Sequence, residues 1–220
     1  TYNGGYLSQR YSLLDQINRE NVNQLELKWV LQNQVFGAWQ SNPIIVDGIM
    51  YVTERPNSVM AVDAVTGRVY WKYRHQNADN ALVCCGANNR GVAVLNDKVY
   101  MGTLDAHLVA LDRVNGQLLW KAEVGDVNLA YSVTMAPLAV KDKILVGVGG
   151  GEFGIRGYVA AFNAETGEPA WKTYTIPGPG EANHDSWEGD DWEHGGAPVW
   201  ITGSFDSDLN LTYLGVGNPG

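Results

Sequence analysis

Cysteine is nearly absent from this sequence: only two occur in 220 residues, and they are adjacent, at Cys84 and Cys85. No second cysteine pair exists to complete a four-cysteine zinc site, and there is no C-x-x-C-H segment of the kind that attaches haem. Long apolar runs are missing as well, and none approaches the roughly 18 residues that span a bilayer. These absences argue against a cysteine-rich zinc module and against a transmembrane protein.

Basic residues are also few. The chain has 15 Lys and Arg against 24 Asp and Glu, a net charge of −9. An acidic protein of this kind is poorly suited to nucleic acid or to an anionic membrane surface, so we expect no nucleic-acid partner. Hydrophobic residues make up 45% and charged residues 18%, which is typical of a globular protein.

The first residue is Thr1 rather than a methionine, and the last residues, "GVGNPG", directly follow a strand-like segment. We therefore expect a chain truncated at its C-terminus and also at its N-terminus. The lack of a targeting segment then says nothing about location.

A repeat organises what is present. Three segments, 61–71, 110–120 and 161–171, share the pattern A-x-[DN]-x-x-[TN]-G-x-x-x-W. Their glycines, Gly67, Gly116 and Gly167, lie 49 and 51 residues apart. Periods of this size are typical of propellers and solenoids.

Each repeat contains about four strand-like runs, which is one propeller blade. In each motif we expect a strand ending at the Asp or Asn, a tight turn with glycine at positive φ, and a strand ending on Trp. The predicted fold is all-β, with residues 1–220 forming part of one propeller of four-stranded blades, an incomplete arc of an eight-bladed ring. Residues 211–217 predict an inner strand of a later blade, and only residues 12–25 predict a short helix.

The repeat tryptophans, Trp71, Trp120 and Trp171, are predicted to pack blade against blade, because large rings dominate packing between sheets. Trp29 predicts the end of an earlier blade. These residues are interpreted as structural.

The adjacent cysteines leave two alternatives open. On a regular strand their side chains would point to opposite faces, and a disulfide between neighbours closes almost no loop, so it adds no chain-entropy stability. Such a bond would suggest a local function. Two free buried thiols are the other reading, because cysteine is often a small core residue.

The surrounding motifs carry a resemblance. "CCGANNRGVAVL", "GTLDAHLVALD", "GGEFGIRG", "YTIPGPGE" and "GVGNPG" resemble segments of the quinoprotein alcohol dehydrogenases, and the resemblance runs from "QRYS" to the end of the chain. That family consists of periplasmic propeller enzymes that use pyrroloquinoline quinone (PQQ). The resemblance implies that Cys84 and Cys85 form a disulfide that lies against one face of PQQ.

The same resemblance implies the rest of a site. Trp200 would stack on the opposite face of PQQ, and Glu152 and Asn218 would bind a metal ion, Ca²⁺ or a lanthanide, as a carboxylate and an amide suit a hard cation. Further cofactor contacts are implied for Gln40, Arg90, Ser132, Thr134, Gly150 and Gly151. Many relatives carry Glu where this chain has Gln40, so the charge there is altered.

The implied function is oxidation of a small alcohol to the aldehyde, with two electrons passing to PQQ and on to a periplasmic acceptor such as cytochrome c. The aspartate expected to act as the catalytic base lies beyond residue 220, so we expect these residues alone to be inactive. The implied location is the bacterial periplasm, after removal of a signal peptide. The alternative is a non-catalytic propeller scaffold of the bacterial envelope, which needs the Trp motif but not the cysteines, Trp200 or Glu152.

Four histidines remain. His184 and His194 lie in the acidic run 181–194, whose spacing matches no ligand motif, and we interpret it as a solvated loop. His75 and His107 have no evident chemical partner in the sequence.

Overall fold

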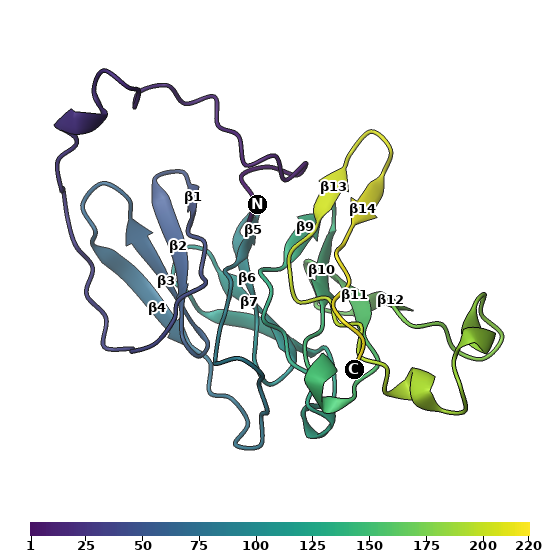
Figure 1. Ribbon diagram of the computed structural model, residues 1–220. Helices are drawn as coiled ribbons and strands as arrows, with labels where there is room; N and C mark the ends of the chain where they lie inside the picture. The colour runs from purple at the N-terminus through teal and green to yellow at the C-terminus, as the bar shows by residue number, and fades with distance from the viewer.

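The computed structural model describes all 220 residues, and it is built almost entirely of short antiparallel strands (Figure 1). Three four-stranded sheets follow one another along the chain, each with its strands in sequence order. The first sheet contains β1 (Ile44–Val46), β2 (Ile49–Glu54), β3 (Ser58–Asp63) and β4 (Val69–Arg74). The second contains β5 (Ala93–Leu95), β6 (Lys98–Gly102), β7 (His107–Asp112) and β8 (Leu118–Glu123). The third contains β9 (Leu138–Val140), β10 (Lys143–Gly147), β11 (Tyr158–Asn163) and β12 (Pro169–Tyr174).

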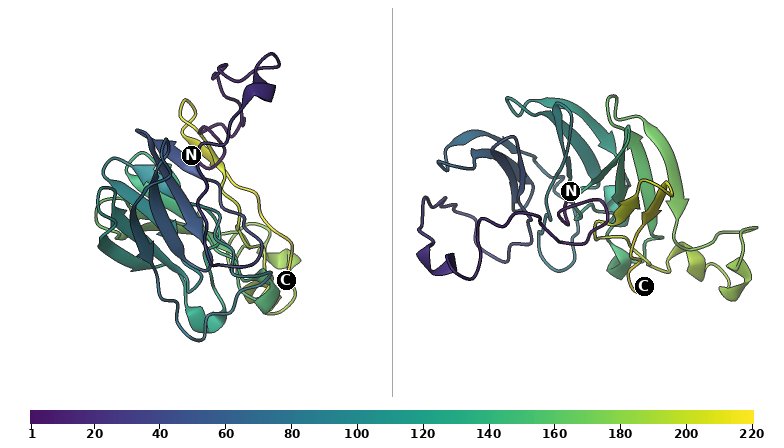
Figure 2. Two further views of the ribbon diagram at one scale, coloured as in Figure 1. Left: turned by 90° about the vertical axis from the view of Figure 1, so that its left-hand side faces the viewer. Right: turned by 90° about the horizontal axis from the view of Figure 1, so that it is seen from above.

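A fourth, two-stranded sheet follows, made of β13 (Ser204–Asp206) and β14 (Leu211–Tyr213). The sheets stand side by side around an arc, as the view from above shows (Figure 2). The predicted all-β fold of four-stranded propeller blades is confirmed, and we refer to the three complete sheets as blades 1, 2 and 3. Residues 211–217 begin with the predicted strand, which ends at Tyr213.

The turn of each repeat forms for a local reason. The carboxylate oxygen Oδ1 of Asp63 accepts hydrogen bonds from the backbone N–H groups of Val65 and Thr66, at 2.9 and 2.8 Å. Asp112 and Asn163 make the same pair of bonds in blades 2 and 3. The glycine that follows has φ between 73° and 76° in all three turns, a conformation that favours glycine, as predicted.

Apolar residues run consecutively along the inner strands, because both faces of a blade are buried and neighbouring side chains point to opposite faces. In β7, Val109 and Leu111 pack toward blade 1, whereas Leu108 and Ala110 pack toward blade 3. The core is therefore not one cluster. It is a series of layers, one between each pair of adjacent sheets, and Phe205 of β13 forms the last with residues of blade 3.

Each repeat tryptophan lies across the boundary to the next blade. The Trp71 indole N–H donates to the Arg113 carbonyl at 3.1 Å, and its ring lies where a side chain on Gly116 would otherwise stand. Trp120 makes the same contacts with Ala164 and Gly167 of blade 3. The prediction that these rings join the blades is confirmed for both.

Trp29 makes the equivalent contacts with blade 1, donating to the Ala64 carbonyl at 3.2 Å and lying against Gly67. It does so from a segment without regular strand structure. Trp171, on the last complete blade, has 45% of its surface exposed.

Two expectations about elements were wrong. The strand after each turn continues three residues past its tryptophan, to Arg74, Glu123 and Tyr174, because pairing with the preceding strand continues. The helix expected at 12–25 does not form: only a 3₁₀ turn, η1 (Val22–Gln24), is present. Its apolar residues are exposed, and an isolated helix of this length is marginal in water without packing.

The remaining 3₁₀ turns are short: η2 (Val127–Leu129), η3 (Gly151–Phe153), η4 (His184–Ser186) and η5 (Asp191–Glu193). No helix here has the length and apolar character needed to cross a bilayer.

Antiparallel order fixes which connections share an end of the blades. The turn between the second and third strands of a blade lies at the same end as the connection to the next blade. The Asp–Gly turns lie at the opposite end. We call these the loop end and the turn end.

Candidate functional site

A cleft opens at the loop end, where four connections from three blades meet. It is lined by residues of 83–90, 132–134, 149–152 and 198–200, together with Asn218 near the C-terminus. Three of these segments link consecutive sheets, and 149–152 lies between β10 and β11 of blade 3. Residues more than 130 positions apart in the sequence therefore share one cleft.

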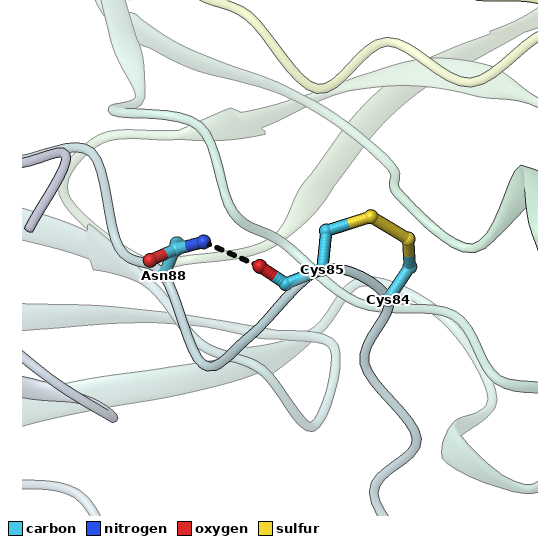
Figure 3. The surroundings of a disulfide bond; sticks show 3 residues. All are labelled: Cys84, Cys85 and Asn88. Carbon is cyan, nitrogen blue, oxygen red and sulfur yellow. Dashed lines mark hydrogen bonds between the residues drawn. A yellow bond between two sulfur atoms is a disulfide. The ribbon is translucent and has the colours of Figure 1, made fainter. Parts of the chain in front are cut away.

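Cys84 and Cys85 form a disulfide between neighbouring residues, with their Cα atoms 3.8 Å apart, and both line the cleft (Figure 3). The bond lies in the connection between β4 and β5. Cys85 has a positive φ of 67°, and its carbonyl accepts a hydrogen bond of 2.9 Å from the Asn88 side-chain amide. The disulfide predicted from the family resemblance is present, and the alternative of two free thiols was wrong.

Arg90 and Trp200 lie together in the cleft, with the guanidinium carbon 4.9 Å from the centre of the indole ring. Arg90 is held by Thr134, whose carbonyl accepts from both the backbone and the side chain of the arginine. Burial lowers the pKa of the guanidinium from its ordinary value, although arginine stays charged at any physiological pH. The cleft therefore contains one fixed positive charge beside one aromatic face.

Glu152 lies in the η3 turn, exposed toward solvent, and its carboxylate approaches the disulfide: the ligand atoms of Cys84, Cys85 and Glu152 all lie within 4.8 Å of one another. The two sulfurs are bonded to each other, so they are not available as thiolate ligands. Asn218 lines the same cleft, because the Asn218 carbonyl accepts from the Ala197 N–H at 3.0 Å and holds the segment beside 195–198. A carboxylate and an amide oxygen are thus available for a hard cation.

Comparison with known proteins identifies the family. The family model described as "Glucose/ethanol/alcohol dehydrogenase, beta-propeller domain" matches residues 1–220. This chain belongs to that PQQ β-propeller family.

Relatives in the family are similar across almost all of this chain. The quinohemoprotein alcohol dehydrogenase ADH-IIG of Pseudomonas putida is 43% identical over 97% of the chain, which corresponds to 32% of that protein. The lanthanide-dependent methanol dehydrogenase of Methylacidiphilum fumariolicum is 40% identical over 99% of the chain and 39% of its own length. A solved europium-containing methanol dehydrogenase superimposes with a TM-score of 0.93 at 37% identity, covering all of this chain and 42% of that one. The chain thus spans about a third to two fifths of the relatives that it matches.

Nine of the eleven residues that the family resemblance singled out lie in the cleft. The structure does not bring Gly151 there: a side chain on it would meet the Pro198 ring at 2.8 Å, so its backbone packs on protein. Gln40 is exposed, in a segment without regular structure, and does not line the cleft either. Asn42, two residues further on, donates from its backbone N–H to the carbonyl of the cleft residue Arg90, so Gln40 lies close in sequence to a residue that holds the cleft wall.

Gly150 lines the cleft, but a protein contact explains why it is glycine. Its φ is 112°, and a side chain there would lie 2.3 Å from the Ala130 carbonyl oxygen. Close approach of backbone to backbone is thus sufficient reason for glycine at this position, and a contact of Gly150 with the cofactor stays a prediction.

The sequence reasoning missed five lining residues: Val83, Gly86, Asn88, Gly149 and Pro198. Asn88 is the informative one. The Asn88 side chain is buried. Its amide nitrogen donates a hydrogen bond to the Cys85 carbonyl, and its amide oxygen has no hydrogen-bond partner. A buried acceptor without a partner is costly, and one that lines a cleft suits a ligand with a donor group. The only signal in the sequence was its place within the quoted "CCGANNRG" motif, which does not show the unpartnered oxygen.

The histidines of the acidic run lie outside the cleft. His184 packs edge-on against Trp192, and the His194 ring bonds to the Gly154 carbonyl. The first contact lies within the 177–194 loop, and the second joins that loop to blade 3.

Proposed function

We propose that this chain forms the cofactor-binding part of a PQQ-dependent dehydrogenase that oxidises a small alcohol to the aldehyde. One observation carries the proposal: the cleft gathers a disulfide between neighbouring cysteines, an arginine, a tryptophan face and two oxygen ligands from three separate connections and the segment after β14. The family of the chain supports it, and so do the names of the relatives above.

The cleft residues fit a flat, polyanionic quinone. The indole of Trp200 offers a face for stacking. The disulfide offers a rigid, polarisable surface, because the bond between the two sulfurs keeps both cysteine side chains from rotating. Arg90 supplies a guanidinium that pairs with carboxylate or quinone oxygens. The hydroxyl groups of Ser132 and Thr134, both nearly buried in the cleft wall, supply donors or acceptors for the remaining polar atoms. PQQ, when bound, would accept two electrons from the alcohol.

Glu152 and Asn218 are the residues that would hold a Ca²⁺ or lanthanide ion, which would polarise a quinone carbonyl as a Lewis acid. Two protein ligands are few for a cation that takes six to eight oxygens. The cofactor and further groups would complete the shell. We place the aspartate that takes the hydroxyl proton of the substrate outside residues 1–220, so the chain by itself is proposed to bind without turning over.

The whole protein would act in the bacterial periplasm, where a disulfide persists, and would pass electrons to an acceptor such as a cytochrome c. The alternative is a non-catalytic propeller scaffold. A scaffold needs the interblade tryptophans but has no use for an arginine, a carboxylate and an exposed tryptophan in one cleft.

The decisive experiment replaces Glu152 in the full-length protein. Glu152→Ala is expected to abolish dye-linked alcohol oxidation and to reduce bound PQQ and bound metal together, because one charged ligand is lost from a shell with few protein ligands. The measurements are substrate-dependent dye reduction, PQQ absorbance after gel filtration, and metal content by mass spectrometry.

Glu168→Ala is the matched control, since Glu168 is an exposed carboxylate at the turn end of the same blade. It should leave all three measurements unchanged. Full activity of Glu152→Ala at low added metal would overturn the metal assignment. Failure of the wild-type protein to bind PQQ at all would favour the scaffold.

A further inference from the structure

A second cluster of ligand-type side chains lies at the loop end, between blades 1 and 2. His75 directly follows β4 of blade 1, and Asp105 and His107 lie in and after the β6–β7 turn of blade 2. The sequence showed no partner for His75 and His107, but the packing of blade 1 against blade 2 brings both of them next to Asp105. The ligand atoms of all three residues lie within 4.8 Å of one another.

The distances suit a tetrahedral ion. Asp105 Oδ1 lies 2.9 Å from His75 Nε2 and 3.4 Å from His107 Nδ1. Around Zn²⁺, where bonds to nitrogen and oxygen are about 2.0–2.1 Å, tetrahedral ligands stand roughly 3.3 Å apart. Small side-chain adjustments would therefore place all three atoms around one ion.

One ring nitrogen points to a ligand. His107 Nδ1 is buried and makes no hydrogen bond, although it lies 3.4 Å from Asp105 Oδ1. A buried ring nitrogen that lies 3.4 Å from a carboxylate without a hydrogen bond is an arrangement that a metal ion would satisfy. The His107 side chain is 21% exposed, so the cluster lies near the surface even though Nδ1 itself is buried.

The carboxylate is already oriented. Thr103 donates from its hydroxyl to Asp105 Oδ1 at 2.6 Å, and the Ala78 backbone N–H donates to Oδ2 at 3.1 Å. Asp105 itself is almost fully buried, with 5% of its side chain exposed. Outer groups that hold a ligand in place are typical of metal sites.

We propose that His75, Asp105 and His107 form a binding site for one Zn²⁺ ion, separate from the cofactor cleft. Two imidazoles and a carboxylate are a ligand set that suits zinc, whereas Glu152 and Asn218 offer only oxygens, which suit harder cations. The imidazole of His75 would carry its proton on Nδ1, and Nε2 would face the ion in place of the hydrogen bond to Asp105.

The site would tie two blades together. It would also fix the start of the connection that carries Cys84 and Cys85, because both His75 and Ala78 belong to that connection. Zinc bound here would therefore stabilise the folded chain, since an ion that binds only the folded state raises its stability by mass action.

The test uses the full-length protein, freed of metal with chelator, and titrated with Zn²⁺ and with Co²⁺ as a spectroscopic probe. One ion per chain is expected, with the intense visible bands of tetrahedral Co²⁺ and a rise in Tm on adding Zn²⁺. His107→Gln should lose these bands and weaken Zn²⁺ binding by at least about 100-fold, more than the loss of an outer-shell group. His184→Gln is the matched control, and Glu152→Ala separates this site from the cofactor cleft; both should bind as the wild type does.

No binding by the wild-type chain would overturn the proposal, as would retention of the Co²⁺ bands in His107→Gln. If that variant fails to fold, NMR of the wild-type imidazoles decides instead. Zn²⁺ should then shift the ring resonances of His75 and His107 and leave those of His184 and His194 in place; the opposite pattern contradicts the site.

Discussion

The two ends of the blades are built from the same strands, yet they differ in kind. At the turn end, three turns repeat one another: the same side-chain oxygen accepts the same two backbone N–H groups, and φ of the glycine varies by only 3°. At the loop end, the connections 75–92, 124–137, 148–157 and 175–203 differ in length and share no motif. The repeated turns take part in the same tryptophan contacts at each blade boundary, whereas the irregular connections line the cleft.

The difference follows from what each end has to do. A blade buries its faces only against its neighbours, so every boundary needs the same joint, and Trp71 and Trp120 supply it in the same way. A cleft for one asymmetric ligand needs a different side chain from each direction. Cys85, Thr134, Glu152 and Trp200 come from four different connections.

The largest effect is expected from removing a joint. Trp71→Ala should lower the free energy of unfolding by about 3–5 kcal/mol, because it empties a buried site and breaks the bond to the Arg113 carbonyl. Within residues 1–220, Trp171→Ala, at the same motif position but 45% exposed, should cost less than about 1 kcal/mol. Urea unfolding followed by far-UV circular dichroism measures both. Equal losses would mean that the tryptophans do not act through interblade docking.

The next effect concerns the glycine beneath that ring. Gly116 has a φ of 73°, and a methyl group on it would lie 2.5 Å from the Trp71 indole. Gly116→Ala should cost at least about 1–2 kcal/mol for the left-handed backbone alone. Gly215→Ala is the control, since Gly215 has open space around it and no positive φ. If both variants unfold at the same urea concentration, close packing at Gly116 is not what the turn requires.

These two positions show why the turn end was predictable from sequence. Its interactions are local: Asp63 bonds to residues two and three positions on, and the positive φ of glycine follows from the turn chemistry. The residues of the motif therefore determine the turn by themselves, and the same turn forms in all three repeats. The helix predicted at 12–25 lacked that support, because no packing surface covers its apolar residues.

The loop end was predictable only through family resemblance, and incompletely. Its contacts join residues of different connections, so spacing alone does not show that Glu152 lies near Cys85, or that His75 meets Asp105 thirty residues later. The family resemblance implied a cofactor contact for Gly151, but a side chain there would meet Pro198, and the residue does not line the cleft. Asn88 was passed over because an unpartnered amide oxygen is visible only in three dimensions.

The disulfide tests whether the loop end contributes to stability. Replacing both Cys84 and Cys85 with serine should change the free energy of unfolding by less than about 1 kcal/mol, because a bond between neighbours closes almost no loop. Retention of PQQ by the full-length protein should fall, since one wall of the cleft is altered. Mass spectrometry after alkylation without reductant checks that the wild-type bond is present. A large loss of stability with PQQ retention unchanged would assign the bond a structural role instead.

The smallest effect lies at the turn end and concerns a single carboxylate. The hydroxyl of Tyr70 donates to Asp63 at 2.7 Å, and that bond, with two backbone N–H groups, lowers the pKa of Asp63 to about 2. Because the folded-state pKa lies below the unfolded value of 3.8, the stabilisation is complete above pH 4 and is lost as the pH falls toward 2. Blade 2 has Leu119 where blade 1 has Tyr70, so this bond distinguishes otherwise matching turns. Tyr70→Phe should move the Asp63 titration, followed by NMR of its carboxyl carbon, back toward the ordinary range, while Tyr11→Phe, in an exposed segment, should not. An Asp63 titration unchanged by Tyr70→Phe would show that the backbone bonds of the turn alone hold the carboxylate charged.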